Sequence, residues 1–149
     1  MSHHLAISID LDELVLDAHL FAPISFVLDG YHYFPDRKWV DFVAIILTWW
    51  VEQCRALVTA PVAEGYTFMF MDGPPFIHAK KISTTEAALT FSTPPPTLDT
   101  AQAVTVSLND LKDSLIEVSQ LVLFRAYEND WEHDTLDTLH RAVQALKKA

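Results

Sequence analysis

A helix-start signal followed by a long apolar run occupies residues 34–50, and this segment predicts the centre of the fold. The thirteen residues from Trp39 to Val51 contain one charged side chain, that of Asp41. Asp36 can accept hydrogen bonds from the first backbone N–H groups of a helix and so begin it. We therefore predict a helix over about 37–58, whose apolar part is shorter than the roughly 20 residues of a membrane span.

The predicted helix has only a narrow polar stripe. Five residues at helical spacing form it, namely Asp41, Thr48, Glu52, Arg55 and Thr59. The rest of the helix surface is apolar, so it needs cover on more than one side. A sheet on one face and other helices on the next would supply that cover.

Strands are predicted on the amino-terminal side of this helix. Residues 5–16 alternate weakly between apolar and polar, and 21–28 form a second apolar run. Asp29 and Gly30 make the dipeptide preferred in tight hairpin turns. Residues 31–34 then return as a short strand.

An antiparallel meander is predicted after the helix. Aromatic and β-branched residues fill 66–71, 76–82 and 86–92, and turn residues separate these segments. The prolines of 93–96 predict a stiff connection, because proline cannot donate to a strand ladder. Residues 103–107 predict one more strand.

Two helices complete the chain. Ser107 can begin the first, over about 108–127, with Leu111, Leu115, Val118 and Val122 as one apolar stripe and Ile116, Leu123, Phe124 and Tyr127 beside it. The second carries a single apolar seam of Leu136, Leu139, Val143 and Leu146. The sequence thus predicts an α+β fold, with an antiparallel sheet packed against a long buried central helix and two C-terminal helices. We expect residues 1–149 to form a single globular domain.

The net charge, the single cysteine and the first residues of the chain limit which partners and which location are expected. The net charge of −10 opposes binding to nucleic acid and to anionic membranes and attracts a basic partner. The only cysteine, Cys54, falls in the apolar helix and is interpreted as a buried, inert thiol. The first residues show no basic start followed by an apolar run, so we expect a cytoplasmic protein.

Candidate chemistry is sparse. His133, Asp137 and His140 have the i, i+4, i+7 spacing of metal ligands on one helix face, but solvated surface histidines are the favoured interpretation. With three glycines and no nucleophile elbow, neither a phosphate loop nor a hydrolase triad is indicated. We therefore predict no catalytic residue, no cofactor and no metal site.

The strongest surface signal is the segment that joins the last two helices. Residues 128–137 carry five carboxylates with no Lys or Arg, and Trp131 lies among them. Tryptophan commonly anchors protein interfaces, and charges steer the encounter. We predict a partner-binding site made of Glu128, Asp130, Trp131, Glu132, Asp134 and Asp137. The alternative is an acidic helix start that complements the helix dipole, with Trp131 packed on the core. A second acidic stretch contains Asp10, Asp12, Glu13 and Asp17.

One pattern within residues 30–80 resembles a known group of proteins. It consists of Phe34-Pro35, Trp39, Asp41-Phe42 and Trp49-Trp50, followed by Phe70-Met71-Asp72-Gly73-Pro74. This pattern is similar to that of small bacterial proteins grouped with the immunity proteins of polymorphic toxin systems. The resemblance implies a non-enzymatic inhibitor that binds a cognate toxin, with a basic nuclease-like toxin as the expected partner and occlusion of its active surface as the mechanism.

Two other classes of function stay open at the sequence level. A small cytosolic enzyme would need a pocket with converging titratable groups, for which Asp41, Glu52, His32 and His78 are the first candidates. A structural or assembly subunit would show an exposed apolar patch, with Trp49-Trp50 as the candidate, and would form a homodimer. The sequence leaves open whether the protein is a monomer or a homodimer.

Overall fold

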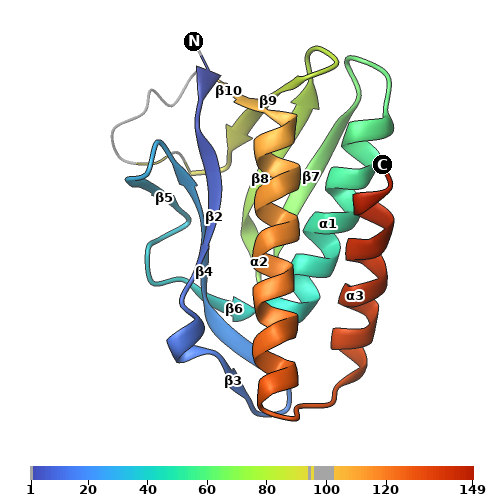
Figure 1. The fold of residues 1–149 in the computed structure, drawn as a ribbon. Coiled ribbons are helices and arrows are strands. Elements are labelled where there is room, and N and C mark those ends of the chain that lie inside the picture. Colours follow the sequence, from blue (N-terminus) through green and yellow to red (C-terminus); the bar gives the residue numbers. More distant parts are fainter. Residues whose placement is uncertain (1, 94, 96–102) are drawn as a thin grey trace.

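The computed structural model describes residues 2–93, 95 and 103–149 (Figure 1). It is an α+β fold with a central helix and two C-terminal helices, as the sequence predicts, and its strands form two sheets where the sequence predicts one antiparallel sheet. The strands of the first sheet, in spatial order, are β1 (Ser2–His3), β10 (Val104–Ser107), β9 (Glu86–Phe91), β8 (Gly73–Lys81) and β7 (Gly65–Phe70). The second sheet is built around β4 (Leu20–Leu28), which pairs with β2 (Leu5–Ile9), β3 (Val15–Leu16), β5 (His32–Phe34) and β6 (Val40–Phe42).

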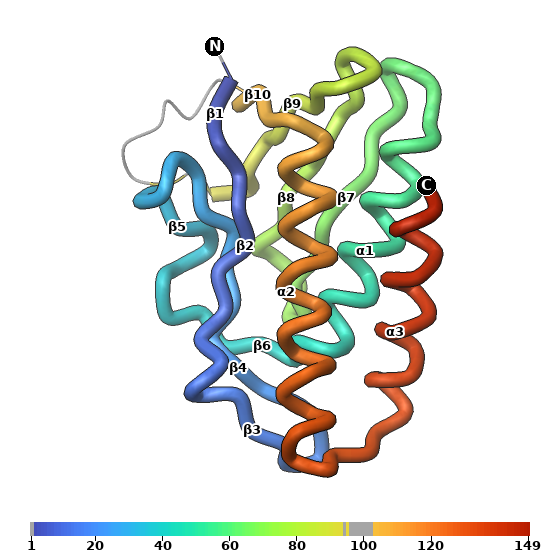
Figure 2. Tube along the Cα trace, viewed as in Figure 1, coloured from blue at the N-terminus to red at the C-terminus, as the bar shows by residue number. Residues whose placement is uncertain are grey.

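The helices are α1 (Val43–Thr59), α2 (Leu108–Glu128) and α3 (Asp134–Lys147). Figure 2 traces α1 and α3 in the same direction, with α2 running the opposite way. Helix α1 contacts α2, α3 and strands β4 and β7, so it is the central helix of the prediction. One connected hydrophobic core includes residues from both sheets and all three helices.

Several local predictions are confirmed. Asp29 and Gly30 both have positive φ, and the Tyr31 N–H donates to Leu28 O, which makes the tight turn between β4 and β5. Strands β7, β8 and β9 form the antiparallel meander. Ser107 accepts the Asp110 N–H at 3.2 Å and begins α2. Within the prolines predicted to stiffen 93–96, Pro94 and Pro96 lie outside the described residues.

The predicted start of the central helix is wrong by about six residues. Asp36 does cap a turn, because its Oδ1 accepts the Lys38 N–H at 2.9 Å. The chain then leaves that turn as β6, which pairs with residues 21–23 of β4, and helix α1 begins only at Val43. The ladder takes the backbone groups that a helix would need, so tertiary pairing overrides the local helix signal.

The same shift moves Asp41 out of the predicted polar stripe. Asp41 lies in β6 and is buried, where its carboxylate accepts the Trp39 Nε1–H at 2.9 Å and the backbone N–H of Met71 at 3.3 Å. Buried carboxylates are tolerated when such donors satisfy them. Asp41 is therefore a structural residue that ties β6 to the end of β7.

Residues 5–16 also differ from the prediction of one strand. Strand β2 stops at Ile9, and a 3-10 turn over Leu11–Glu13 follows before β3. The Asp10 side chain accepts the Asp12 N–H at 3.1 Å, so it begins this turn. Aspartate commonly favours such turns over a continuing strand.

Aromatic residues from β4, α1 and β7 pack together in the hydrophobic core. The Trp50 ring is fully buried 4.7 Å from the Phe26 ring and 5.2 Å from the Phe70 ring, measured between centroids. Its Nε1–H donates to Met69 O at 2.7 Å.

A buried lysine closes the C-terminal end of α1. The Lys81 Nζ donates to Val58 O and Ala60 O at 2.7 and 2.8 Å. That ammonium satisfies carbonyls that helix ends otherwise leave without a partner.

Candidate functional site

The predicted partner-binding segment lies at the end of the molecule where α2 passes into α3 (Figure 1). All five of its carboxylates are exposed, on Glu128, Asp130, Glu132, Asp134 and Asp137. Trp131 is half-buried and packs against the hydrophobic core. The acids are therefore available to a partner, whereas only part of the Trp131 side chain is.

Hydrogen bonds fix the backbone of this segment. The Trp131 N–H donates to Ala126 O at 2.9 Å, which closes the end of α2, and Asp130 takes a positive φ of 54° in the turn. His133 begins α3, because its Nδ1 accepts the Thr135 N–H at 3.2 Å. Asp134 and Asp137 lie in the first turn of α3, where they also complement the helix dipole.

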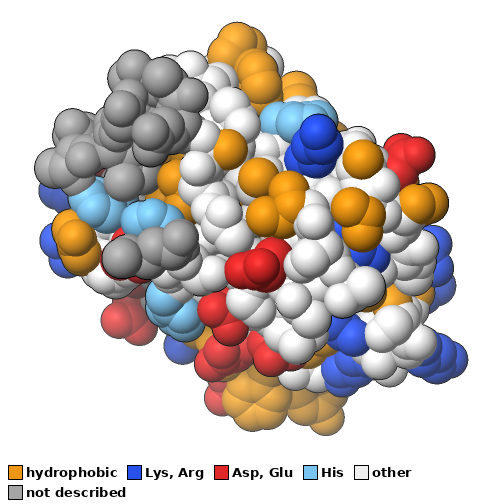
Figure 3. Space-filling view, turned by 90° about the horizontal axis from the view of Figure 1, so that it is seen from above, with side chains coloured by type: hydrophobic (Ala, Val, Ile, Leu, Met, Phe, Trp, Pro, Cys, Tyr) orange, Lys and Arg blue, Asp and Glu red, His pale blue; other side chains and the backbone are white. Residues whose placement is uncertain are grey.

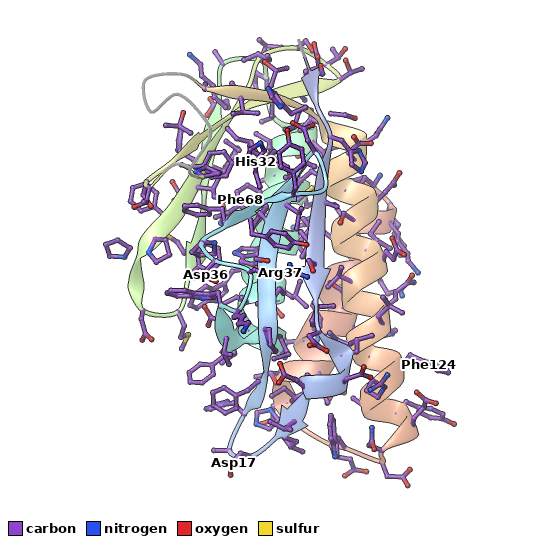
Figure 4. All side chains as sticks on the ribbon, turned by 90° about the vertical axis from the view of Figure 1, so that its left-hand side faces the viewer. Asp17, His32, Asp36, Arg37, Phe68 and Phe124 are labelled. Atoms are coloured by element: carbon purple, nitrogen blue, oxygen red, sulfur yellow. The ribbon has the colours of Figure 1, made fainter. Side chains whose placement is uncertain are left out.

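The second acidic stretch lies beside the first. The His133 Nε2–H donates to Ala18 O at 2.9 Å, and Arg125 Nη1 donates to Leu11 O at 2.9 Å. Figure 4 shows Asp17 at the tip of the loop between β3 and β4, at this end of the molecule. Two segments more than 100 residues apart in the chain are thus joined by hydrogen bonds.

We call this surface the acidic end. It contains the carboxylates of both stretches, namely Asp10, Asp12, Glu13, Asp17, Glu128, Asp130, Glu132, Asp134 and Asp137, all of them exposed. Arg125 lies among them, with its Nε 3.8 Å from the Glu128 carboxylate. At the edge of this surface, Asp10 and Glu13 line a hollow together with Arg37 and Lys38. The sequence predicted both stretches but could not show that the fold brings them together.

An exposed apolar face of α2 adjoins the acidic end, and the sequence interpretation missed it. Leu121, Phe124 and Tyr127 expose 41, 62 and 81% of their surface, although Phe124 and Tyr127 were predicted to flank the buried stripe. Figure 4 shows Phe124 projecting from α2 into solvent. The helical spacing of Phe124 could have identified it as an outward-facing residue. Phe124 is two residues from both Val122 and Ala126, which places it about 200° around the helix from either.

The histidine constellation does not form on one helix face. His133 precedes α3 and has an extended backbone, so the i, i+4, i+7 geometry with Asp137 and His140 does not arise. Its two ring nitrogens bond to Ala18 and Thr135. Among residues 2–93, 95 and 103–149, no group of three His, Cys, Asp or Glu side chains is placed to hold a metal ion.

The residues considered for an enzyme lie on different elements. Asp41 is held by the contacts of β6 described above, whereas Glu52 lines an exposed groove between α1 and α3. His32 is buried on β5, and His78 is exposed on β8, with its Nδ1 3.3 Å from the Thr67 hydroxyl. Asp41, Glu52 and His78 therefore each contact a different set of residues.

The two adjacent tryptophans of α1 also separate. Trp50 is buried, while Trp49 is 37% exposed. Trp49 lines a hollow of about 360 Å³ together with Met69 and Met71. The apolar patch expected around both tryptophans is therefore confined to Trp49 and its methionine neighbours.

Cys54 is fully buried in α1, as predicted. Burial raises the pKa of its thiol to about 12, because the apolar surroundings disfavour the thiolate. The thiolate is the reactive form, so this cysteine is protected from modification in the folded protein.

Within the part of the chain that the structure covers, no helix has the length and apolarity to cross a membrane. Comparison of the chain with protein-family models, with curated proteins and with solved structures finds no match. The resemblance to immunity proteins therefore stays a prediction carried by the motifs of residues 30–80.

Proposed function

We propose that this protein is an immunity-type inhibitor that acts in the cytoplasm, where it binds a basic, nuclease-like toxin and occludes its active or substrate-binding surface. The acidic end makes the contact. The observation that carries the proposal is that the fold joins two distant acidic stretches into one exposed surface.

Charge would supply the first step of binding. A nuclease needs Lys and Arg side chains to hold the phosphates of its substrate. The carboxylates of the acidic end complement such a surface, and the net charge of −10 extends the attraction beyond contact distance. Occupation of these cations by carboxylates excludes the nucleic acid.

The apolar face of α2 would supply the anchor. Charged contacts at an exposed rim contribute little to affinity, whereas aromatic residues at the centre of an interface contribute most of it. Phe124 and Tyr127 protrude beside the acids, and Trp131 presents its exposed part among them. In this proposal the acids select a basic partner and the aromatic side chains hold it.

The experiment requires the toxin gene that is expected beside the gene of an immunity protein. Asp130, Glu132 and Asp134 are replaced together by Lys, and the affinity for the purified toxin is measured by calorimetry. Each reversed rim charge costs about 1 kcal/mol, so the triple variant is expected to bind more than about a hundredfold more weakly. Nuclease activity in the presence of the variant should be restored to a matching extent.

Two controls make this experiment decisive. Replacement of Glu52, Glu64 and Glu117 by Lys makes the same change in net charge at exposed positions outside the acidic end, and it is expected to weaken binding less than about tenfold. Far-ultraviolet circular dichroism checks that both variants fold. Equal losses in the two variants, or unchanged affinity in the first, would contradict this site. Absence of inhibition by the unmodified protein would contradict the immunity function itself.

A homodimeric assembly subunit is the second candidate, and the exposed face of α2 favours it. A second copy could cover Leu121, Phe124 and Tyr127 across a two-fold axis. Sedimentation equilibrium separates the two candidates. The immunity proposal expects a monomer without toxin, and a dimer that Phe124→Ala and Tyr127→Ala dissociate would support the assembly subunit instead.

A further inference from the structure

A groove between α1 and α3 collects positive charge on this otherwise acidic protein. The groove has a volume of about 710 Å³ and is lined on one side by Glu52 and Arg55 and on the other by His140, Arg141 and Lys148. The cations of Arg55, Arg141 and Lys148 thus outnumber the Glu52 carboxylate. Ala56 and Ala145 also line the groove. A second hollow of about 470 Å³ shares Arg55, Arg141 and Ala145 and extends the groove to Thr138.

The groove lies away from the acidic end. The larger hollow is lined by the second half of α1 and by residues 140–149, whereas the acidic end surrounds the start of α3. Only the second hollow reaches Thr138, the residue after Asp137. Figure 3 views the molecule from the end where α3 finishes and shows Lys and Arg side chains gathered on its right-hand side. Helix α3 thus carries acids at its start and cations at its end, so the two surfaces attract partners of opposite charge.

The cations of the groove are not used by the fold. Within residues 2–93, 95 and 103–149, neither Arg55, Arg141 nor Lys148 forms an ion pair with a carboxylate, although the chain contains 20 acidic residues. All three side chains are exposed. Lys148, at the end of α3, complements the helix dipole, but Arg55 and Arg141 precede the last turn of their helices. The dipole therefore does not account for the two arginines.

Arginine pairs on neighbouring helices suit carboxylates. A guanidinium group can bind a carboxylate through two parallel hydrogen bonds, and two such groups facing one groove can hold two carboxylates of one segment. Residues 138–148 of α3 rise by about 15 Å, which matches an extended peptide of about five residues. The exposed Gln144 side chain lines the same groove and offers an amide to the backbone of a peptide.

We propose that the α1–α3 groove binds an extended acidic segment of a partner protein, with Arg55 and Arg141 as the residues that pair with its carboxylates. The groove is open to solvent, and the net charge of −10 opposes a longer polyanion such as nucleic acid. This surface is separate from the acidic end, so the proposal does not depend on the immunity function.

The test measures binding of a fluorescein-labelled hexaglutamate peptide to the full chain by fluorescence anisotropy, at low salt and at physiological salt. The variant Arg55→Glu with Arg141→Glu is compared with a control variant, Lys38→Glu with Lys80→Glu. The control makes the same change in net charge at two exposed positions, one in the turn before β6 (Lys38) and one on β8 (Lys80). The groove variant is expected to bind at least about tenfold more weakly, and the control variant less than about threefold.

Several results would overturn the proposal. They are absence of hexaglutamate binding to the unmodified protein, equal losses in the two variants, and displacement of the peptide by an equimolar concentration of inorganic phosphate, which would indicate a small-anion site. Self-association that only the groove variant abolishes would identify a second copy of the chain as the occupant instead. If the double reversal prevents folding, Arg55→Gln with Arg141→Gln removes the charges without adding acids and is compared with Lys38→Gln and Lys80→Gln.

Discussion

Helices α1 and α2 are both rich in apolar residues, but they use them differently. Trp50 and most other large apolar residues of α1 are buried, because strands cover one side of this helix and α2 and α3 cover another. Helix α2 buries the stripe that faces its neighbours and leaves Leu121, Phe124 and Tyr127 exposed. An apolar side chain that the core does not use is a candidate for binding, whereas a buried one is explained by folding.

The largest expected difference between the two helices is in stability. Trp50→Ala should lower the free energy of unfolding by about 3–5 kcal/mol, because it removes a fully buried ring and leaves a cavity. Phe124→Ala should change it by less than about 0.5 kcal/mol, as expected for an exposed position. Urea denaturation of both variants measures the contrast. A cost above about 2 kcal/mol for Phe124→Ala would mean that the outer face of α2 belongs to the core.

Lys81 gives a comparison at the end of α1. Lys81→Ala should cost about 1–3 kcal/mol, since it removes the buried ammonium that satisfies the carbonyls of Val58 and Ala60. The neighbouring Lys80 is exposed, and Lys80→Ala should be neutral within about 0.5 kcal/mol. Thermal and urea unfolding of the pair measure the difference. Equal effects would show that Lys81 contributes only its charge.

The burial of Cys54 in α1 can be tested by the pH dependence of the protein's stability. The pKa of its thiol is raised from 9.0 to about 12 in the folded protein, so its contribution to stability is complete below pH 9.0 and is lost as the pH rises toward 12. Between about pH 8 and pH 10 the unmodified protein should therefore lose about 1.4 kcal/mol more stability than Cys54→Ala does. Urea denaturation at the two pH values measures this difference. Identical pH dependence in the two proteins would mean that the thiol is accessible to water.

Local chemistry was sufficient for much of the fold. The Asp29-Gly30 turn, the Ser107 cap and the apolar seam of α3 act between residues close in the chain, and each appears as predicted. The start of α1 could not be predicted in this way. Asp36 gives a valid cap signal, but pairing of β6 with β4 depends on residues 17 to 21 positions earlier in the chain.

The candidate surfaces also differ in whether local chemistry was sufficient to predict them. The sequence identified the acids of residues 128–137 as exposed, since carboxylates are rarely buried without a partner, and it named residues 10–17 as a second acidic stretch. It could also have assigned Phe124 to the outer face of α2, because helical spacing alone places it opposite Val122. It treated the two acidic stretches as separate.

The sequence by itself determined most of the secondary structure elements, the α+β class and the acidic character of residues 10–17 and 128–137, because these depend on periodicity and on side chains near one another in the chain. Only the tertiary structure decided which segments share a surface. The hydrogen bonds of His133 and Arg125 join the two acidic stretches, and the packing of α1 on α3 brings Arg55 and Arg141 to one groove. Those contacts follow from the burial of the common core, to which distant parts of the chain contribute together.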